Sequence, residues 1–194
     1  IGPNCLGVMS PYSNLNATFA KTMALAGGIG FISQSGAMCT SMLDYANDIG
    51  VGFSAFISVG SMSDIEFKDC IEYLANDPKT HTIFLYMETI GGFIRICQKA
   101  SFKKPIVAIK PGRSEAARKA AASHTGSLVG SDTAVEAIFD KGHVLRAETM
   151  EEFFDLFTYY ALEEVPTGDR IGIITNAGGM GVLTTDAIEV NGAK

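Results

Sequence analysis

The chain has little cysteine, and what it has is not arranged to bind a metal ion. Cys5, Cys39, Cys70 and Cys97 are the four cysteines in 194 residues, with no C-x-x-C pair and no histidine at ligand spacing. Zinc sites need such clustered ligands, so we expect no metal site in this chain. Free thiols are typical of the reducing cytoplasm, which favours a cytoplasmic protein.

An excess of positive charge and a targeting signal are also absent. Asp and Glu (21) outnumber Lys and Arg (15), and the net charge of −6 argues against nucleic acid as a main partner. No signal peptide is visible. Residues 22–43 are uncharged and long enough for a membrane span, but glycines and a glutamine divide them into strand, turn and helix. We therefore expect neither nucleic acid nor a membrane as a partner.

What the chain does have is apolar material in a regular alternation. Hydrophobic residues make up 47% of it, which is enough to build a core. Strands are predicted at residues 28–33, 53–59, 81–87, 105–110, 143–147 and 170–175. Helices are predicted at residues 35–49, 66–76, 93–100, 131–141, 150–163 and 180–190. This alternation predicts a parallel sheet with helices on both faces.

The length of the chain suits one complete domain and part of another. We expect an irregular lead-in over residues 1–21, a first domain over 22–164, and the start of a second α/β domain over 168–194. Residues 163–169 (EEVPTGD) have the composition of a linker between them. The chain lacks an initiator methionine and ends shortly after a predicted helix, so we expect a piece of a longer protein.

A short internal repeat connects the two expected domains. Residues 29–38 (IGFISQSGAM) match residues 171–180 (IGIITNAGGM) in character at nearly every position. Each segment is interpreted as a strand, a polar turn with glycine, and the start of an apolar helix. Free N–H groups and the helix dipole at such a point favour anions, so two units can hold one phosphate from two sides. Neither turn matches G-x-G-x-x-G or a P-loop, and each taken singly also fits an ordinary turn between a strand and a helix.

His124 is the most informative residue of the chain. It lies in residues 120–130 (AAASHTGSLVG), which we expect to be a loop of small residues that lets a ligand come close. A basic stretch over residues 110–119 precedes it. Neutral imidazole is a nucleophile near pH 7, so this setting indicates phosphoryl chemistry. A surface histidine without a role fits the local composition equally well.

Polar residues follow four predicted strands and are expected to meet at one edge of the sheet. Residues 33–36 follow the first strand, Gly60 and Ser61 the second, Glu88 the third, and Lys110 the fourth. Open α/β sheets bind ligands at this carboxyl edge. The Glu88 carboxylate can accept a hydrogen bond from one nitrogen of His124 and leave the other nitrogen to attack phosphorus. Alternatively, Glu88 is an acid favoured at a helix N-terminus.

Six motifs together give the chain a family resemblance. They are GPNCLG (2–7), SQSGA (33–37), SVG (58–60), ETIGG (88–92), KPGR (110–113) and SHTGSLVGSD (123–132). The chain resembles ADP-forming acyl-CoA synthetases of the acetate–CoA ligase type, relatives of succinyl-CoA synthetase, over essentially its whole length. The resemblance implies a flavodoxin-like, doubly wound parallel sheet over residues 22–164. It also implies that residues 1–21 are the tail end of a CoA-binding domain and that residues 168–194 begin a second ligase-CoA-type α/β domain.

The resemblance also implies roles for single residues. His124 matches the histidine that becomes phosphorylated, and Glu88 matches the glutamate that holds it. The implied phosphate ligands, on the loop of the histidine and at the two helix starts that flank it, are Ser33, Gln34, Ser35, Gly36, Thr125, Gly126, Asn176, Gly178 and Gly179. Pro3 and Asn4 match a segment near the thioester end of CoA. One departure from the family pattern is SMSD at residues 61–64, where the family commonly has Asn and then an Ala-Asp pair.

The reaction implied is acyl-CoA + ADP + phosphate ⇌ carboxylate + CoA + ATP, with His124 relaying the phosphoryl group. CoA and ATP or ADP are then the substrates, and Mg²⁺ accompanies ATP mainly in a domain outside this chain. The expected partners are an ATP-grasp domain or subunit, CoA and a small carboxylic acid, in an oligomeric assembly. The isolated fragment is expected to be inactive. The acid, and the choice of ADP or GDP, stay open.

Two other functions fit the same scaffold. The first is a CoA-sensing regulatory module of a protein lysine acetyltransferase, and the second is a catalytically silent CoA-binding protein. Regulatory versions can lose the histidine, so the presence of both His124 and Glu88 favours the synthetase.

Overall fold

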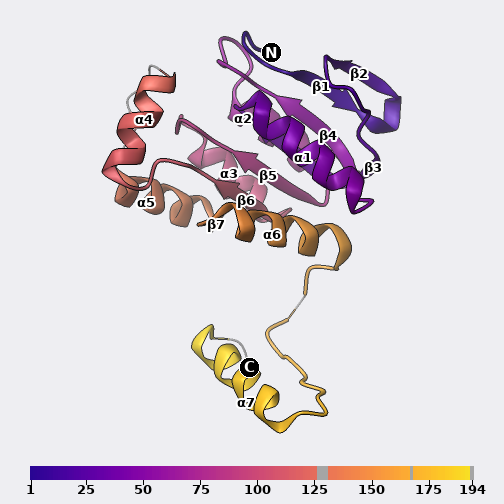
Figure 1. Ribbon diagram of the computed structural model, residues 1–194, viewed down its shortest axis with the longest axis vertical. Helices are drawn as coiled ribbons and strands as arrows, with labels where there is room; N and C mark the ends of the chain where they lie inside the picture. Colours follow the sequence, from indigo (N-terminus) through magenta and orange to yellow (C-terminus); the bar gives the residue numbers. More distant parts are fainter. Residues whose placement is uncertain (126–130, 167, 193–194) are drawn as a thin grey trace. The chain divides into compact units, whose positions relative to one another are not determined.

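The computed structural model describes residues 1–125, 131–166 and 168–192 (Figure 1). It divides into two compact units, Ile1–Leu162 and Glu163–Lys194. None of the helices in the described ranges combines the length and apolar character that a transmembrane span requires.

The first unit is built around one sheet, seven-stranded over the described residues. Its strands are β1 (Gly7–Ser10), β2 (Leu15–Thr18), β3 (Ala26–Ser33), β4 (Phe53–Ser58), β5 (Thr82–Tyr86), β6 (Ile106–Ile109) and β7 (Leu145–Ala147). The order is β2-β1-β4-β3-β5-β6-β7, and all pairs from β4 to β7 are parallel. Numbered among themselves, these parallel strands have the order 2-1-3-4-5, which confirms the flavodoxin-like α/β fold.

Two strands of this sheet, β1 and β2, lie within residues 1–21, so the prediction of an irregular lead-in is wrong there. β1 pairs antiparallel with both β2 and β4, which makes the sheet mixed and not purely parallel. Both strands have only four residues, and β2 is mostly exposed, so neither shows an alternating pattern in sequence. Gly7 is required here, because a Cβ at this position would lie 2.1 Å from the carbonyl oxygen of Ala17 on β2.

Helices cover both faces of the sheet (Figure 1). They are α1 (Gly36–Asp48), α2 (Phe67–Asn76), α3 (Ile94–Ser101), α4 (Glu115–Thr125), α5 (Asp132–Gly142) and α6 (Met150–Leu162), with a short 3-10 helix at Pro11–Ser13. The apolar sides of α2, α3 and α5 pack in one core, and those of α1 and α6 pack in the other. Phenylalanines dominate the second core; the ring centroids of Phe84 and Phe157, for example, lie 5.4 Å apart. This is the doubly wound arrangement that the alternation of elements predicts.

Helix α4 replaces part of the loop that the sequence predicted around His124. The helix runs to Thr125, so the backbone of His124 lies in its last turn. The sequence EAARKAAA over residues 115–122 consists of strong helix formers, and their intrinsic preference explains the difference. The small size of these residues is compatible with a loop, but their helix propensity favours the helix that forms.

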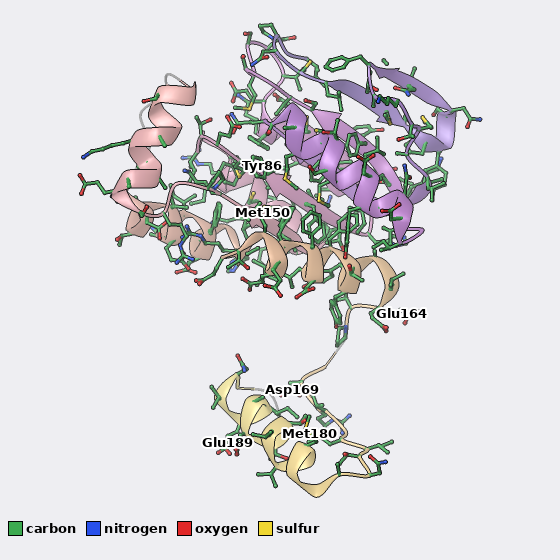
Figure 2. The ribbon with its side chains drawn as sticks, viewed as in Figure 1. Tyr86, Met150, Glu164, Asp169, Met180 and Glu189 are labelled. Carbon is green, nitrogen blue, oxygen red and sulfur yellow. The ribbon has the colours of Figure 1, made fainter. Side chains whose placement is uncertain are left out.

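The second unit contains helix α7 (Gly178–Val190) and no strand within its described residues. The strand predicted at residues 170–175 is therefore wrong for this structure. A strand needs a hydrogen-bonded neighbour, and this unit offers none in its described part. Its apolar side chains are correspondingly exposed, including Ile174 (101%) and Met180 (60%), which Figure 2 labels on α7.

Candidate functional site

A cavity of about 550 Å³ lies at the carboxyl edge of the sheet. It is placed where the loops after the neighbouring strands β3 and β5 diverge, since β3 leads into α1 on one face and β5 leads to α3 on the other. Ligands of open α/β sheets bind at such a switch point. The residues that line the cavity are Asn4, Cys5, Leu6, Phe19, Gln34, Ser35, Gly36, Ala37 and Glu88.

The N-terminus of α1 forms one wall of this cavity. Ser35 is the N-cap, and its hydroxyl oxygen accepts a hydrogen bond of 3.2 Å from the N–H of Met38. The N–H groups of Gly36 and Ala37 have no partner among the residues that the structure describes. A Cβ on Gly36 would meet no atom within 4 Å, so a ligand can approach the backbone. These free donors, together with the helix dipole, form a site suited to an anion.

Gln34 fixes the loop after β5 beside this helix start. Its side-chain carbonyl oxygen accepts hydrogen bonds from the N–H groups of Glu88 (2.7 Å) and Thr89 (2.9 Å), and its amide nitrogen donates to the Thr89 hydroxyl at 3.0 Å. The backbone N–H of Gln34 also donates to the carbonyl of Tyr86, which Figure 2 labels at the end of β5. Gln34 therefore joins the two loops at the switch point, and its predicted contact with phosphate stays a prediction.

Glu88 is the carboxylate of the cavity. It is half-buried and lies two residues beyond the end of β5, with its backbone held by Gln34. Burial first, and then the negative charge of Glu88, raises the pKa of the neighbouring Tyr86. The cavity thus has a carboxylate on one side and free N–H donors on another, an arrangement that suits a ligand with an anionic part toward α1 and a proton-donating part toward Glu88.

The loop at residues 2–5 closes another side of the cavity. The carbonyl of Pro3 accepts a hydrogen bond of 2.9 Å from Ser61, and the N–H of Leu6 donates to the buried Ser58 hydroxyl at 2.9 Å. A Cβ on Gly60 would lie 2.3 Å from the Pro3 carbonyl oxygen, so this close approach requires glycine. Asn4 lines the cavity, and the carbonyl of Pro3 anchors the loop; the predicted contacts of both residues with CoA stay predictions.

Ser33 has a different role from the predicted one. Its side chain is completely buried, donates to the Ser35 carbonyl at 2.9 Å and accepts from the Ser35 N–H at 3.0 Å. The hydroxyl therefore orders the turn and is not offered to a phosphate, because the buried end of β3 encloses it. Burial raises the pKa of the nearby Cys39 thiol to about 11, in spite of hydrogen bonds to Ser33 and Ser58. Cys39 is thus a neutral core residue near pH 7.

The side chain of His124 lies outside the described part of the structure, as do the side chain of Thr125 and all of Gly126. Their predicted roles stay predictions. The structure does show the residues that flank the segment 114–131, which carries them. Arg113, just before α4, and Asp132, the first residue of α5, approach each other to 3.4 Å.

A buried arginine, Arg146, forms further ion pairs at this place. Arg146, whose side chain is 6% exposed, contacts Asp132 and Glu136, each at 2.5 Å. Burial alone would raise the pKa of Asp132, but Arg146 and Arg113 hold it below its ordinary value. Burial, followed by the charge of Arg146, lowers the pKa of Lys110, which is 4% exposed. Charged groups therefore fix both ends of residues 114–131, the segment with His124.

The start of α7 in the second unit repeats the turn seen before α1. The Thr175 hydroxyl donates to the Ala177 carbonyl at 3.2 Å and accepts from the Ala177 N–H at 3.0 Å, as Ser33 does with Ser35. The N-cap is Ala177, which has no side-chain oxygen, so the N–H groups of the next residues stay free within the described part. The predicted ligands Asn176, Gly178 and Gly179 are all exposed there.

Sequence reasoning missed the apolar part of the cavity. Phe19 follows β2, in the segment that the sequence predicted to be irregular, so no pattern pointed to it. Cys5, Leu6 and Ala37 lie within the motifs but carry no polar group that would have marked them. The predicted residues that the cavity does bring together are Asn4, Gln34, Ser35, Gly36 and Glu88.

A family model and several known proteins are similar to this chain. Residues 26–160 match the family model described as the succinyl-CoA ligase like flavodoxin domain. The chain is 47% identical over 189 residues to acetate–CoA ligase [ADP-forming] of Methanocaldococcus jannaschii, which covers 96% of the chain and 27% of that protein. It is 46% identical over 197 residues to the alpha subunit of acetate–CoA ligase [ADP-forming] II of Pyrococcus furiosus, covering 100% of the chain and 43% of the relative.

A solved structure is similar over the whole chain. It is the dinucleotide forming acetyl-coenzyme A synthetase 1 of Ca. Korarchaeum cryptofilum in complex with phosphate and ADP, with 37% identity and a TM-score of 0.90. The chain corresponds to 43% of that protein. It therefore spans less than half the length of each of these three relatives.

Proposed function

We propose a function for this chain from one premise: it belongs to the family of the succinyl-CoA ligase like flavodoxin domain. The chain is the part of an ADP-forming acyl-CoA ligase that carries the phosphorylated histidine. The complete enzyme interconverts acyl-CoA, ADP and phosphate with carboxylate, CoA and ATP. The names of the relatives, which are ADP-forming acetate–CoA ligases, support this reaction class.

One observation carries the proposal: free N–H groups and a fixed carboxylate line the same cavity. The N–H donors on Gly36 and Ala37 suit the oxygens of a phosphoryl group. Glu88 lines the same cavity, and its backbone is held by a hydrogen bond to Gln34. A histidine that accepts a phosphoryl group needs both features. The N–H donors stabilise the negative charge of the phosphate, and the carboxylate orients the proton on the imidazole.

The acyl phosphate forms first, when phosphate attacks the thioester carbonyl of acyl-CoA and CoA leaves as the thiol. In the next step, the imidazole of His124 attacks the phosphorus of the acyl phosphate. An N–P bond forms, the P–O bond to the acyl group breaks, and the carboxylate leaves. Glu88 accepts a hydrogen bond from the other ring nitrogen, which fixes the tautomer and stabilises the positive charge on the ring. In the last step, ADP takes the phosphoryl group from His124 and becomes ATP. Relay through the histidine divides one transfer into two easier ones.

The remaining components lie partly outside this chain. Asn4 contacts the thioester end of CoA, and the start of α7 supplies a second set of N–H groups through Asn176, Gly178 and Gly179. An ATP-grasp domain or subunit binds the nucleotide with Mg²⁺, in an oligomeric assembly. Residues 168–194 begin the second α/β domain. Residues 1–21 are the tail end of the CoA-binding domain, and their strands β1 and β2 join the sheet of the first unit. The free thiols support a cytoplasmic location.

Labelled ATP tests the proposal directly. The chain, combined with its ATP-grasp unit, is expected to acquire an acid-labile and base-stable phosphoryl group that peptide mapping assigns to His124. His124→Ala is expected to abolish the label, because it removes the phosphoryl acceptor. His143→Ala is a matched control, since His143 is the exposed C-cap residue of α5, and it should leave labelling unchanged. Label that persists in His124→Ala would overturn the proposal.

A further inference from the structure

The cavity has two chemically different sides. Its polar side consists of Asn4, Gln34, Ser35 and Glu88 with the backbone of Gly36, and all of these have a part in the proposed function, Asn4 with CoA and the others in the phosphoryl transfer. Its apolar side consists of Cys5, Leu6, Phe19 and Ala37, and phosphoryl transfer needs none of them. The volume of about 550 Å³ is within the usual range for pockets that hold small organic ligands, and it exceeds what a phosphate group requires.

Phe19 is the unusual member of the apolar side. Its side chain is 78% exposed although it is a large aromatic residue. The turn around it is ordered, because the Thr18 N–H donates to the Asn16 side chain at 3.0 Å and the Ala20 N–H donates to the Thr18 hydroxyl at 3.0 Å. An ordered turn thus presents an aromatic surface at the rim of the cavity.

Leu6 also lines the cavity, although it is only 3% exposed. Its N–H donates to the buried Ser58 hydroxyl. Leu6 belongs to the core cluster of α1 and α6, so packing fixes its position. A hydrocarbon group in the cavity would contact a rigid floor at Leu6 and an exposed ring at Phe19.

We propose that Phe19 is a specificity-determining residue, which with Leu6 contacts the hydrocarbon tail of the carboxylic acid. The inference rests on the proposed function. The carboxyl end of the acid takes the polar side, close to the N–H groups of α1, and the tail takes the apolar side. Burial of apolar surface stabilises the bound acid in proportion to the area that both partners remove from water. Phe19 therefore favours acids with tails longer than that of acetate.

The test compares acids of increasing length in the complete enzyme that contains this chain. kcat/KM is measured for acetate, butyrate, hexanoate and phenylacetate in the wild type, Phe19→Ala and Phe19→Leu. In Phe19→Ala, the ratio of hexanoate to acetate is expected to fall about 10-fold, since a few methylene contacts in a pocket have effects of this order. Phe19→Leu should restore most of the ratio, because leucine keeps an apolar contact.

Phe102→Ala is the matched control. Phe102 is also highly exposed (85%), but it caps α3 beside His143, with ring centroids 6.0 Å apart, and does not line the cavity. This variant should leave every ratio at its wild-type value. A ratio unchanged in Phe19→Ala, a rise in favour of hexanoate, or an equal fall in Phe102→Ala would each overturn the inference.

Two further measurements distinguish selection of the acid from a contact with CoA and from failure of the phosphoryl transfer itself. An increase in KM for CoA that is the same with every acid would assign Phe19 to the thiol arm of CoA and would also overturn the inference. Labelling of His124 by ATP is followed in the same preparations. If the wild type is labelled but the ratios do not change, only the inference on Phe19 fails; if the wild type is not labelled, the proposed function fails and the inference fails with it.

Discussion

The two halves of the internal repeat share a turn but differ in their surroundings. In each half, a hydroxyl residue bridges the backbone of the residue two positions later: Ser33 with Ser35, and Thr175 with Ala177. The strand before the first turn is β3, paired on both sides in the sheet. The segment before the second turn, residues 171–175, forms no strand. Local sequence thus determines the turn and the helix start, whereas the strand depends on its neighbours.

The two helix starts also differ in what remains free. Ser35 caps α1 and uses the N–H of Met38, so Gly36 and Ala37 keep free donors. Ala177 cannot cap, and α7 leaves the donors of Gly178, Gly179 and Met180 without a side-chain partner in the described residues. The first start also borders a cavity with a carboxylate, Glu88. Among the described residues, the first half therefore combines free N–H donors with a carboxylate in one cavity, and the second half has the free donors alone.

Of the changes considered, removal of the charge of Glu88 should have the largest effect on the first half of the repeat, through the rate of His124 phosphorylation. Glu88→Gln is nearly isosteric, and the backbone bond from residue 88 to Gln34 remains, so the fold should be retained. Phosphorylation of His124 by ATP is expected to slow by about 10²-fold, the usual cost of losing an electrostatic partner in a site of this kind. Circular dichroism checks the fold, and rapid-quench labelling measures the rate.

Glu72→Gln is the matched control for this change. Glu72 is an exposed carboxylate on α2 that does not line the cavity at Glu88, so its removal should leave the labelling rate unchanged. A wild-type rate in Glu88→Gln, or the same slow rate in both variants, would show that the carboxylate has no special part.

Mutation of the hydroxyl residue in each turn should have a smaller effect, on the free energy of unfolding, and compares the two turns directly. Ser33→Ala removes two hydrogen bonds to the backbone of Ser35 in a completely buried place, so it should lower the free energy of unfolding by about 1–2 kcal/mol. Thr175→Ala removes the same pair of bonds where the turn is exposed to water, and its effect should stay within about 0.5 kcal/mol. Urea unfolding followed by circular dichroism measures both. Equal losses would mean that the turn, and not its burial in the sheet, determines the energy.

The sequence predicted the parallel part of the fold because β3, β4, β5 and β6 are buried apolar segments between clear turns. β1 and β2 form no such buried run, since β1 is mostly half-buried and β2 is mostly exposed. α4 was missed because alanines were interpreted by size and not by helix propensity. The strand at residues 170–175 was predicted from a pattern that has no partner to pair with in the described part of its unit.

The polar half of the site was predictable for the same reason that the sheet was. Parallel strands bring their carboxyl ends to one edge, so Gln34, Ser35, Gly36 and Glu88 had to lie close together. The internal hydrogen bonds that divert Ser33 from ligand binding were not predictable, because they depend on the conformation of the turn. Phe19 carried no sequence signal at all, since its approach to the cavity follows from the pairing of β1 with β2 and β4.

Phosphate titration of the ¹⁵N-labelled chain tests the central claim most directly, namely that the start of α1 in the cavity is an anion site. The amide resonances of Gly36 and Ala37 should shift in a saturable way with inorganic phosphate, because their N–H groups are free and border the cavity. Those of Gly178 and Gly179 should shift weakly and without saturation, since that helix start stands exposed to water. Saturable shifts confined to Gly178 and Gly179, or no shift at Gly36 and Ala37, would contradict the account.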